Sequence, residues 1–266
     1  MSAVDAGKRL YQRAVDILCP RPILFHHVPK CGGTSVARAM RRSYLLSQAT
    51  VKPNESRNAL ASMQGRGERL GFALHDLREA MLLYLLHDNV RCIAAHVPFS
   101  ESAFAEFADR YAFVTILRDP VDRFLSHYRW SQRPERPASS PETLEEFVAR
   151  DRERQTGATY VRYFCGDPGA QQFTTADVDS AIRNLRRLNS VGFLDDLPSF
   201  EQKLSTLAGR RLRIGKENVG KAPAVGKTAL DGPLHDAVLK ACTRDREVWD
   251  AVQDLRTAAP RLPGGI

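Results

Sequence analysis

Residues 111–117 carry the nearly continuous apolar sequence YAFVTIL, which predicts a strand buried on both of its faces. Strands of that kind belong to parallel sheets whose two faces are covered by helices. Shorter apolar runs at residues 23–27, 91–95 and 190–193 predict further strands, and segments with helical spacing separate them. The sequence therefore predicts an α/β fold with a mostly parallel central sheet flanked by helices.

The expected helices follow from apolar spacing and from capping signals such as Asp119 before Pro120. They cover residues 8–18, 34–46, 74–86, 120–132, 142–150, 176–188, 199–208 and 233–256. We expect residues 47–72 to be irregular, residues 134–141 to form an exposed connection, and the tail 258–266 to be loose. A length of 266 residues suits a single domain spanning residues 1–266.

The chain is basic, with 39 Lys and Arg against 31 Asp and Glu and a formal net charge of +8. This balance favours anionic partners such as nucleotides and acidic glycans, and it is equally compatible with a charge that only serves solubility. The five cysteines are widely spaced and include no C-x-x-C pair. We therefore expect free thiols rather than a disulfide framework or a zinc site.

The expected location is cytoplasmic. No apolar run follows the first nine residues, so we expect no signal peptide. The apolar stretch at residues 80–86 is too short to cross a bilayer, so we expect no transmembrane segment.

A loop with two glycines, residues 28–33, joins the first strand to the helix expected from Thr34. Glycines let backbone N–H groups approach an anion, and the start of a helix directs further N–H groups and a positive dipole end to the same place. Lys30 and the hydroxyls of Thr34 and Ser35 add donors. Since ligands of parallel sheets bind at the carboxyl ends of the strands, we predict a P-loop-like phosphate-binding loop here.

Arg118 ends the strand at residues 111–117, and its guanidinium fork suits a phosphate. The loop differs from the nucleotide-triphosphatase motif G-x-x-x-x-G-K-[ST], because Lys30 precedes the glycines instead of following them. No G-x-G-x-x-G follows a strand, which disfavours a dinucleotide-dependent oxidoreductase.

Residues 27–35, with the sequence HVPKCGGTS, resemble the 5′-phosphosulfate loop of sulfotransferases that use 3′-phosphoadenosine-5′-phosphosulfate (PAPS). They are similar to the glycan O-sulfotransferase branch related to heparan sulfate 2-O-sulfotransferase. Residues 114–128 resemble the 3′-phosphate segment of that family, and residues 94–99 resemble its G-H-x-P-[FY] segment, with Ala95 in place of glycine. Weaker similarities lie at residues 162–166 and 191–196.

The resemblance implies a role for each matching residue. Arg118 and Ser126 would bind the 3′-phosphate, and Lys30 would stabilise the leaving nucleotide, PAP. Lys216 and Lys221 occupy the place of a basic segment that closes over the nucleotide. The 5′-phosphate would be held by Lys30, Cys31, Gly32, Gly33, Thr34 and Ser35.

The resemblance also implies an acceptor with a hydroxyl group, on a carbohydrate or a small molecule, and such an acceptor needs a base. His96 is the candidate, since an ordinary histidine pKa of about 6.5 suits proton abstraction near neutrality. His27 belongs to the loop pattern and is expected to support the loop. No metal is expected, because no cluster of His, Asp and Glu has the spacing of metal ligands.

Two other functions stay open from the residues alone. A kinase of the same broad fold would need a lysine after the glycines and an acidic residue for magnesium, a part that Asp119 could play. A non-catalytic module for anionic glycans would fit the net charge of +8. No nucleic-acid-binding motif is present, and the basic residues Arg183, Arg186 and Arg187 are expected to form a solvated helix face or an acceptor-side patch.

Overall fold

The computed structural model describes residues 18–63, 73–133, 142–215 and 232–264, together with residues 7, 10, 11 and 14. Within these residues a parallel five-stranded sheet has the spatial order β2-β3-β1-β4-β5. The strands are β1 (Ile23–His26), β2 (Gln48–Val51), β3 (Cys92–Ala95), β4 (Ala112–Leu117) and β5 (Ser190–Phe193). The predicted α/β fold with a parallel sheet is confirmed.

The four predicted strands are buried along their whole length, as continuous apolar runs require. The fifth strand, β2, lies in residues 47–72, where an irregular segment was expected, and that expectation was wrong. It occupies the edge of the sheet and is buried only at Val51. An edge strand with a solvated face needs no apolar run, so its sequence QATV does not show the pattern of a buried strand.

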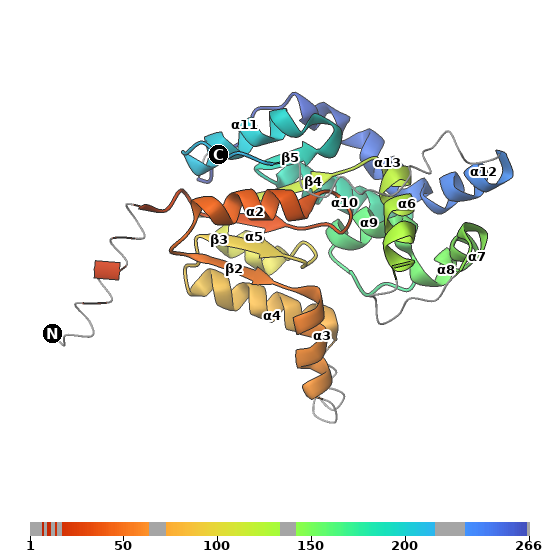
Figure 1. The fold of residues 1–266 in the computed structure, drawn as a ribbon, viewed down its shortest axis with the longest axis horizontal. Helices are drawn as coiled ribbons and strands as arrows, with labels where there is room; N and C mark the ends of the chain where they lie inside the picture. Colours follow the sequence, from red (N-terminus) through yellow and green to blue (C-terminus); the bar gives the residue numbers. More distant parts are fainter. Residues whose placement is uncertain are drawn as a thin grey trace.

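Helices connect the strands and cover the sheet (Figure 1). In Figure 1 helices α6 to α9 and α12 gather beyond the carboxyl ends of the strands. The described helices are α2 (Gly33–Ser43), α3 (Pro53–Ser62), α4 (Leu74–His87), α5 (Glu101–Phe107), α6 (Pro120–Ser131), α7 (Leu144–Ala149), α8 (Asp151–Arg154), α9 (Thr159–Phe164), α10 (Thr175–Arg187), α11 (Leu197–Ala208), α12 (Gly232–Ala241) and α13 (Thr243–Ala251), with 3₁₀ turns η2 (Thr156–Ala158), η3 (Leu194–Asp196) and η5 (Gln253–Arg256).

Side-chain caps explain where several helices begin. Asp119 accepts a hydrogen bond from the Asp122 amide at the start of α6, with Pro120 in the first turn as predicted. Thr143 and Thr174 form reciprocal capping boxes with Glu146 and Asp177 at the starts of α7 and α10.

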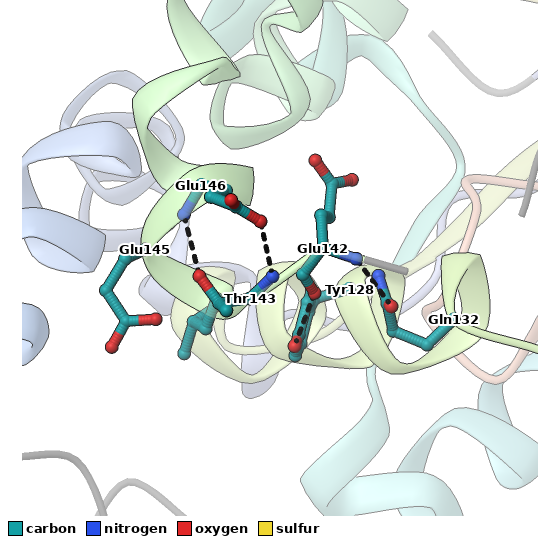
Figure 2. Close-up of a pocket in the computed structure, with 7 residues that line it drawn as sticks. Tyr128, Gln132, Glu142, Thr143, Glu145 and Glu146 are labelled. Carbon is teal, nitrogen blue, oxygen red and sulfur yellow. Dashed lines mark hydrogen bonds between the residues drawn. The ribbon is translucent and has the colours of Figure 1, made fainter. Parts of the chain in front are cut away.

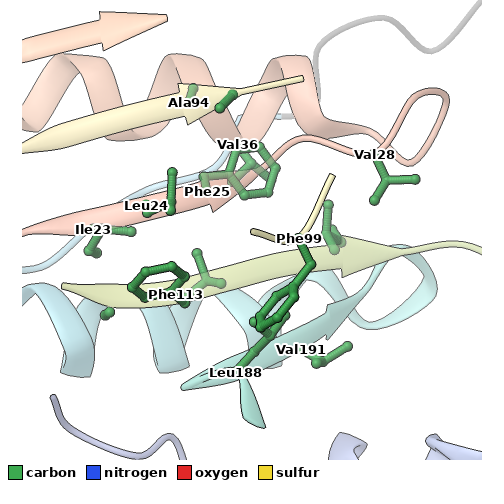
Figure 3. Packing of buried hydrophobic residues seen from close by; sticks show 14 of the residues in the cluster. Ile23, Leu24, Phe25, Val28, Val36, Ala94, Phe99, Phe113, Leu188 and Val191 are labelled. Atoms are coloured by element: carbon green, nitrogen blue, oxygen red, sulfur yellow. The ribbon is translucent and has the colours of Figure 1, made fainter. Parts of the chain in front are cut away.

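The main core lies between the sheet and the helices that pack on it. Figure 3 shows Phe25 of β1, Phe113 of β4 and Val36 of α2 packed together with Phe99 and Val191. A second, smaller apolar cluster joins Val121, Phe124 and Leu125 of α6 to α7 and α12.

The two clusters explain why the helix expected at residues 233–256 is interrupted. Val238 and Cys242 pack in the smaller cluster with α6 and α7, whereas Val248 and Val252 pack in the main core. One straight helix cannot present the two stretches to both cores. The chain therefore ends α12 at Ala241, starts α13 at Thr243, and finishes in η5.

The tail was expected to be loose, and at Arg261 this expectation was wrong. The Arg261 amide donates to the Asn189 carbonyl at 2.9 Å, and Asn189 Nδ2 donates to the Arg261 carbonyl at 2.7 Å. Asn189 directly precedes β5, so the tail is attached to the sheet at the start of that strand. The connection expected at residues 134–141 and most of the helix expected at residues 8–18 lie outside the described residues.

All five cysteines are free thiols. Among the helices described, none combines the length and the apolar character needed to traverse a bilayer.

Candidate active site

The predicted site residues follow three neighbouring strands. In the register of the sheet, His26 of β1 lies beside Ala95 of β3 and Thr115 of β4. Because the strands are parallel, the loop after β1, His96 after β3 and Arg118 after β4 emerge at one edge of the sheet. The chain reverses its order across the sheet between β1 and β4, and crevices at such points bind ligands in α/β proteins.

The loop between β1 and α2 presents backbone amides that none of the described residues accepts from. Lys30 and Gly32 have left-handed backbone angles, with φ of 67° and 78°. Gly32 precedes α2 without a side-chain cap, and the first turn of α2 holds no acidic residue. Among the described residues, the amides from Cys31 to Thr34 have no acceptor. Such a helix start is suited to an anion.

One predicted donor of this loop is used elsewhere. The Ser35 amide donates to the Gly32 carbonyl at 3.1 Å, so only the hydroxyl of Ser35 could contribute to binding. The loop amides that can donate to an anion are therefore those from Cys31 to Thr34.

Gly33 allows the loop to lie directly against His27. A Cβ atom at Gly33 would stand 2.2 Å from Cδ2 of the His27 ring. The backbone angle of Gly33 is not left-handed, so the requirement for glycine here is one of space. The His27 ring therefore lies directly against the loop, and its expected role in supporting the loop stays a prediction.

Lys30 is half-buried, and its Nζ lies 5.6 Å from the ring centroid of Trp130 on α6. A cation above an indole face is attracted to it, so α6 helps to orient the lysine. Trp130 was not predicted as a site residue, because nothing in the local sequence of this helix distinguishes it from its polar and apolar neighbours.

His96 stacks on His27, with ring centroids 4.0 Å apart and an interplanar angle of 29°. Burial and the charge of Arg78 lower the pKa of His96 to about 4, while a hydrogen bond with the His27 backbone acts in the opposite direction. Arg78 is buried on α4 and donates to Ser56 and to the Pro53 carbonyl. His96 is therefore neutral at neutral pH and able to accept a proton.

Arg118 and the phosphate loop are connected through Tyr160 of α9. The Arg118 amide donates to the Tyr160 hydroxyl at 2.9 Å, and the same oxygen lies 3.6 Å from Sγ of Cys31. The half-buried Arg118 guanidinium has no acidic partner in the described part of the chain. Ser126 is half-buried on α6, and its proposed contact with a phosphate stays a prediction.

Comparison with known proteins identifies the family. A family model described as "Sulfotransferase family" matches residues 17–164, which is more than half of the chain. This chain belongs to the sulfotransferase family. The predicted membership is thereby confirmed, whereas the predicted 2-O branch of the glycan enzymes is not.

Individual relatives of this chain are distant. Heparan-sulfate 6-O-sulfotransferase 2 of Mus musculus is 29% identical over 112 residues, which are 42% of this chain and 18% of that protein. A sulfotransferase from Alicyclobacillus acidocaldarius is 18% identical and overlaps 86% of this chain and 99% of its own, with a TM-score of 0.41. A mouse sulfotransferase complexed with PAP is 13% identical over 88% of this chain and 67% of its own, also with a TM-score of 0.41.

Two predicted site residues, Lys216 and Lys221, lie outside the described residues. Among the residues that are described, no group of three or more His, Cys, Asp and Glu side chains is placed to hold a metal ion. The predicted basic face of α10 is engaged in ion pairs, since Arg186 contacts Asp254 and Arg187 contacts Glu101.

A separate hollow lies between α6 and α7, lined by Tyr128, Gln132, Glu142 and Glu146 among others (Figure 2). Glu146 takes part in the cap of α7, and Glu142 pairs with Arg150 and Arg154. Its lining carries carboxylates and no basic residue, which is unfavourable for a phosphosulfate. The anion-binding features lie instead at the start of α2 and at Arg118.

Proposed function

We propose that this chain transfers the sulfuryl group of PAPS to an acceptor hydroxyl of a carbohydrate. The observation that carries the proposal is the pairing of two anion-binding features at one sheet edge. The unused amides at the start of α2 and the Arg118 guanidinium follow adjacent strands. PAPS carries phosphate groups at both the 5′ and the 3′ position, which matches two such features.

The residues present fit this donor. The amides from Cys31 to Thr34 would hold the 5′-phosphate, and Arg118, with Ser126 nearby on α6, would hold the 3′-phosphate. When bound, PAPS supplies the sulfuryl group. Lys30, oriented by Trp130, would place its positive charge where negative charge develops on the leaving group. Lys216 and Lys221 remain candidates for covering the nucleotide.

His96 is proposed as the base that takes the proton from the acceptor hydroxyl. Its stacking on His27 fixes the plane of the ring. Burial leaves the ring uncharged near pH 7, and the lowered pKa also makes it a weaker base than an ordinary histidine, so the role rests on the position of His96 after β3 and not on its pKa. We expect His96→Ala to lower kcat by about 10²–10⁴-fold, the range for loss of a general base. Binding of PAP should stay unchanged.

The carbohydrate acceptor is supported by the loop pattern HVPKCGGTS and by the relative named as a heparan-sulfate 6-O-sulfotransferase. The position on the sugar, including the 2-O preference, stays part of the proposal. So does the cytoplasmic location.

The donor is tested by thermal unfolding of the purified chain with PAP, with ATP plus magnesium, and with NADPH. A ligand that binds only the folded state raises the melting temperature. We expect a rise with PAP that is absent with NADPH and lost in Arg118→Ala. Arg110→Ala is the matched control, because Arg110 is exposed and precedes β4, at the opposite end of the strand from Arg118.

Two results would contradict the proposal. A larger rise with ATP and magnesium than with PAP would favour a kinase. A rise with PAP and no transfer of labelled sulfate from PAPS to any glycan, phenol or peptide would favour an anion-binding module.

A further inference from the structure

The buried hydroxyl of Tyr160 lies between the two loops assigned to the donor. Tyr160 is fully buried on α9. Its oxygen accepts a hydrogen bond from the Arg118 amide at 2.9 Å and donates one to the Arg118 carbonyl. On its other side it lies 3.6 Å from Sγ of Cys31, in the loop that presents the free amides. A single atom therefore contacts the backbone of Arg118 and the thiol of Cys31, one residue from each anion-binding feature.

The backbone of Tyr160 is itself held by a buried carboxylate. The carboxylate of Asp245, on α13, accepts hydrogen bonds from the amides of Tyr160 at 2.8 Å and Val161 at 3.2 Å. Asp245 is completely buried and lies 3.7 Å from Nε of Arg123, a completely buried residue of α6. Arg123 also donates to the Thr156 carbonyl in η2. The backbone of Tyr160 is thus attached to α13, a helix that belongs to neither loop.

Arg118 directly follows β4, and its backbone on both sides of Cα is bound by the same hydroxyl. These two hydrogen bonds restrain the direction in which the Arg118 side chain leaves the strand. Because the same hydroxyl also contacts Cys31, the position of Arg118 is fixed relative to the loop that carries the amides. These contacts restrain the distance between the proposed site for the 5′-phosphate and the proposed site for the 3′-phosphate.

We propose that Tyr160 is a positioning residue that sets this separation, so that the site selects a nucleotide with phosphates at both the 5′ and 3′ positions over one with a 5′-phosphate alone. The proposal rests on the proposed function, because it assigns the two features to one nucleotide. Tyr160 acts through Arg118 and Cys31 and does not itself touch the donor.

The test compares the dissociation constants of PAP and adenosine 5′-monophosphate (AMP) by calorimetry in the full chain and in Tyr160→Phe. Loss of one buried hydrogen-bonding group weakens an interaction by up to about tenfold. We expect this loss for PAP and little change for AMP, so the preference for PAP over AMP falls by nearly the same factor. An unchanged preference, or an equal loss for both nucleotides, would overturn the proposal.

Tyr44→Phe is the matched control. Tyr44 is also fully buried, and its hydroxyl donates to the Arg21 carbonyl at 2.5 Å, before the start of β1 and thus at the opposite end of the sheet. We expect it to lower stability without changing the preference for PAP. A merely structural role of Tyr160 would make the two variants behave alike.

A double-mutant cycle separates action through Arg118 from a general effect. Arg118→Ala should bind PAP only as weakly as AMP, so this arm is measured by calorimetry at high nucleotide concentration. In that background the Tyr160→Phe change should no longer alter PAP affinity, because the group that it positions is gone. Additive losses would contradict the mechanism. If Tyr160→Phe does not fold, Cys31→Ala breaks the loop side of the contact, and unchanged affinities for both nucleotides would then reject the proposal.

The two hypotheses fail differently. If the wild-type chain does not bind PAP, the proposed function is wrong. If the wild-type chain prefers PAP over AMP and Tyr160→Phe keeps that preference, only the role of Tyr160 is wrong.

Discussion

At the residue scale, the tightest steric requirement of the site is the contact between Gly33 and His27. In Gly33→Ala the added methyl would lie 2.2 Å from the His27 ring, so the ring or the loop must move. We expect a loss of about 1–3 kcal/mol in the free energy of unfolding and weaker binding of PAP. Urea unfolding and calorimetry measure the two effects.

Gly169→Ala is the control for this change. Gly169 is exposed, and the nearest atom to an added Cβ would be 3.6 Å away, at ordinary contact distance. Its unfolding free energy should change by no more than a few tenths of a kcal/mol. Equal behaviour of the two variants would show that the Gly33 contact does not constrain the loop.

A second prediction at this scale concerns His26, which is completely buried on β1 with its Nδ1 3.2 Å from the Val97 carbonyl oxygen. Burial lowers its pKa from 6.5 to about 4. Between these values the unfolded chain binds a proton that the folded chain does not, so the free energy of unfolding falls as the pH drops through this window. From about pH 7.5 to about pH 5 this residue should account for a loss of about 2 kcal/mol.

His26→Gln removes this titration and keeps a polar group that can donate to Val97. Urea unfolding at both pH values should show a smaller loss in the variant than in the wild-type chain. His96 and His127, whose pKa values are also lowered to about 4 by burial, titrate in both proteins and cancel in the comparison. Identical pH dependence in the two proteins would contradict the assignment.

Some residues of the proposed site could be recognised from the local sequence, and others could not. Lys30, the loop glycines and Arg118 were predicted, because each directly follows a strand whose apolar run is visible. Tyr160, Trp130 and Arg78 were not, because their roles depend on contacts with distant segments. Tyr160 meets Cys31 across 129 positions of the chain, a proximity that no local pattern encodes.

At the scale of elements, α2 combines an uncapped start with a first turn free of acidic residues. Thr34→Asp places a carboxylate there, at an exposed position. The negative charge should stabilise the helix by about 0.3–1 kcal/mol through its dipole. It should also repel the 5′-phosphate and weaken PAP binding by tenfold or more, so stability and affinity move in opposite directions.

Thr34→Asn is the neutral control, with a side chain of the same shape and no charge. Thermal unfolding without ligand and calorimetry with PAP give the two readouts. If Thr34→Asp bound PAP as tightly as Thr34→Asn, the start of α2 would not be the phosphate site.

Helices and strands were predicted correctly where the pattern of apolar residues follows directly from which faces are buried. The four fully buried strands and the capped helix after Asp119 have patterns that depend on few neighbours. The elements that were missed are the edge strand β2, the helix α3 within residues 47–72 where an irregular segment was expected, the short helices α5, α8 and α9, and the break between α12 and α13. Each of these is decided by tertiary packing, since the edge strand pairs on one side only and the broken helix serves two apolar clusters.

At the scale of the whole molecule, Asn189 connects the tail to the sheet. Its Oδ1 accepts from the Phe113 amide at 2.8 Å, and its Nδ2 donates to the Arg261 carbonyl at 2.7 Å. Asn189→Ala should lower the free energy of unfolding by about 1–2 kcal/mol, as expected for two lost hydrogen bonds. Affinity for PAP should not change, because Asn189 precedes β5 at the end of the sheet opposite the site.

Urea unfolding together with calorimetry tests this separation. A loss of PAP affinity in Asn189→Ala that exceeds the loss in Tyr44→Phe would show that the tail and the site are coupled through the sheet. Equal affinities would confirm that the attachment of the tail serves stability alone.

The carboxylate of Asp245 has a consequence for the exchange of segments between relatives. The family match ends at residue 164, inside the region of α9, yet the group that receives the α9 amides comes from α13. A chimera that joins the first 164 residues to the carboxyl-terminal part of another sulfotransferase would leave those amides, and the buried Arg123, without their carboxylate. Recombination intended to change the acceptor therefore has to carry an aspartate at the position of residue 245, or exchange the two segments together.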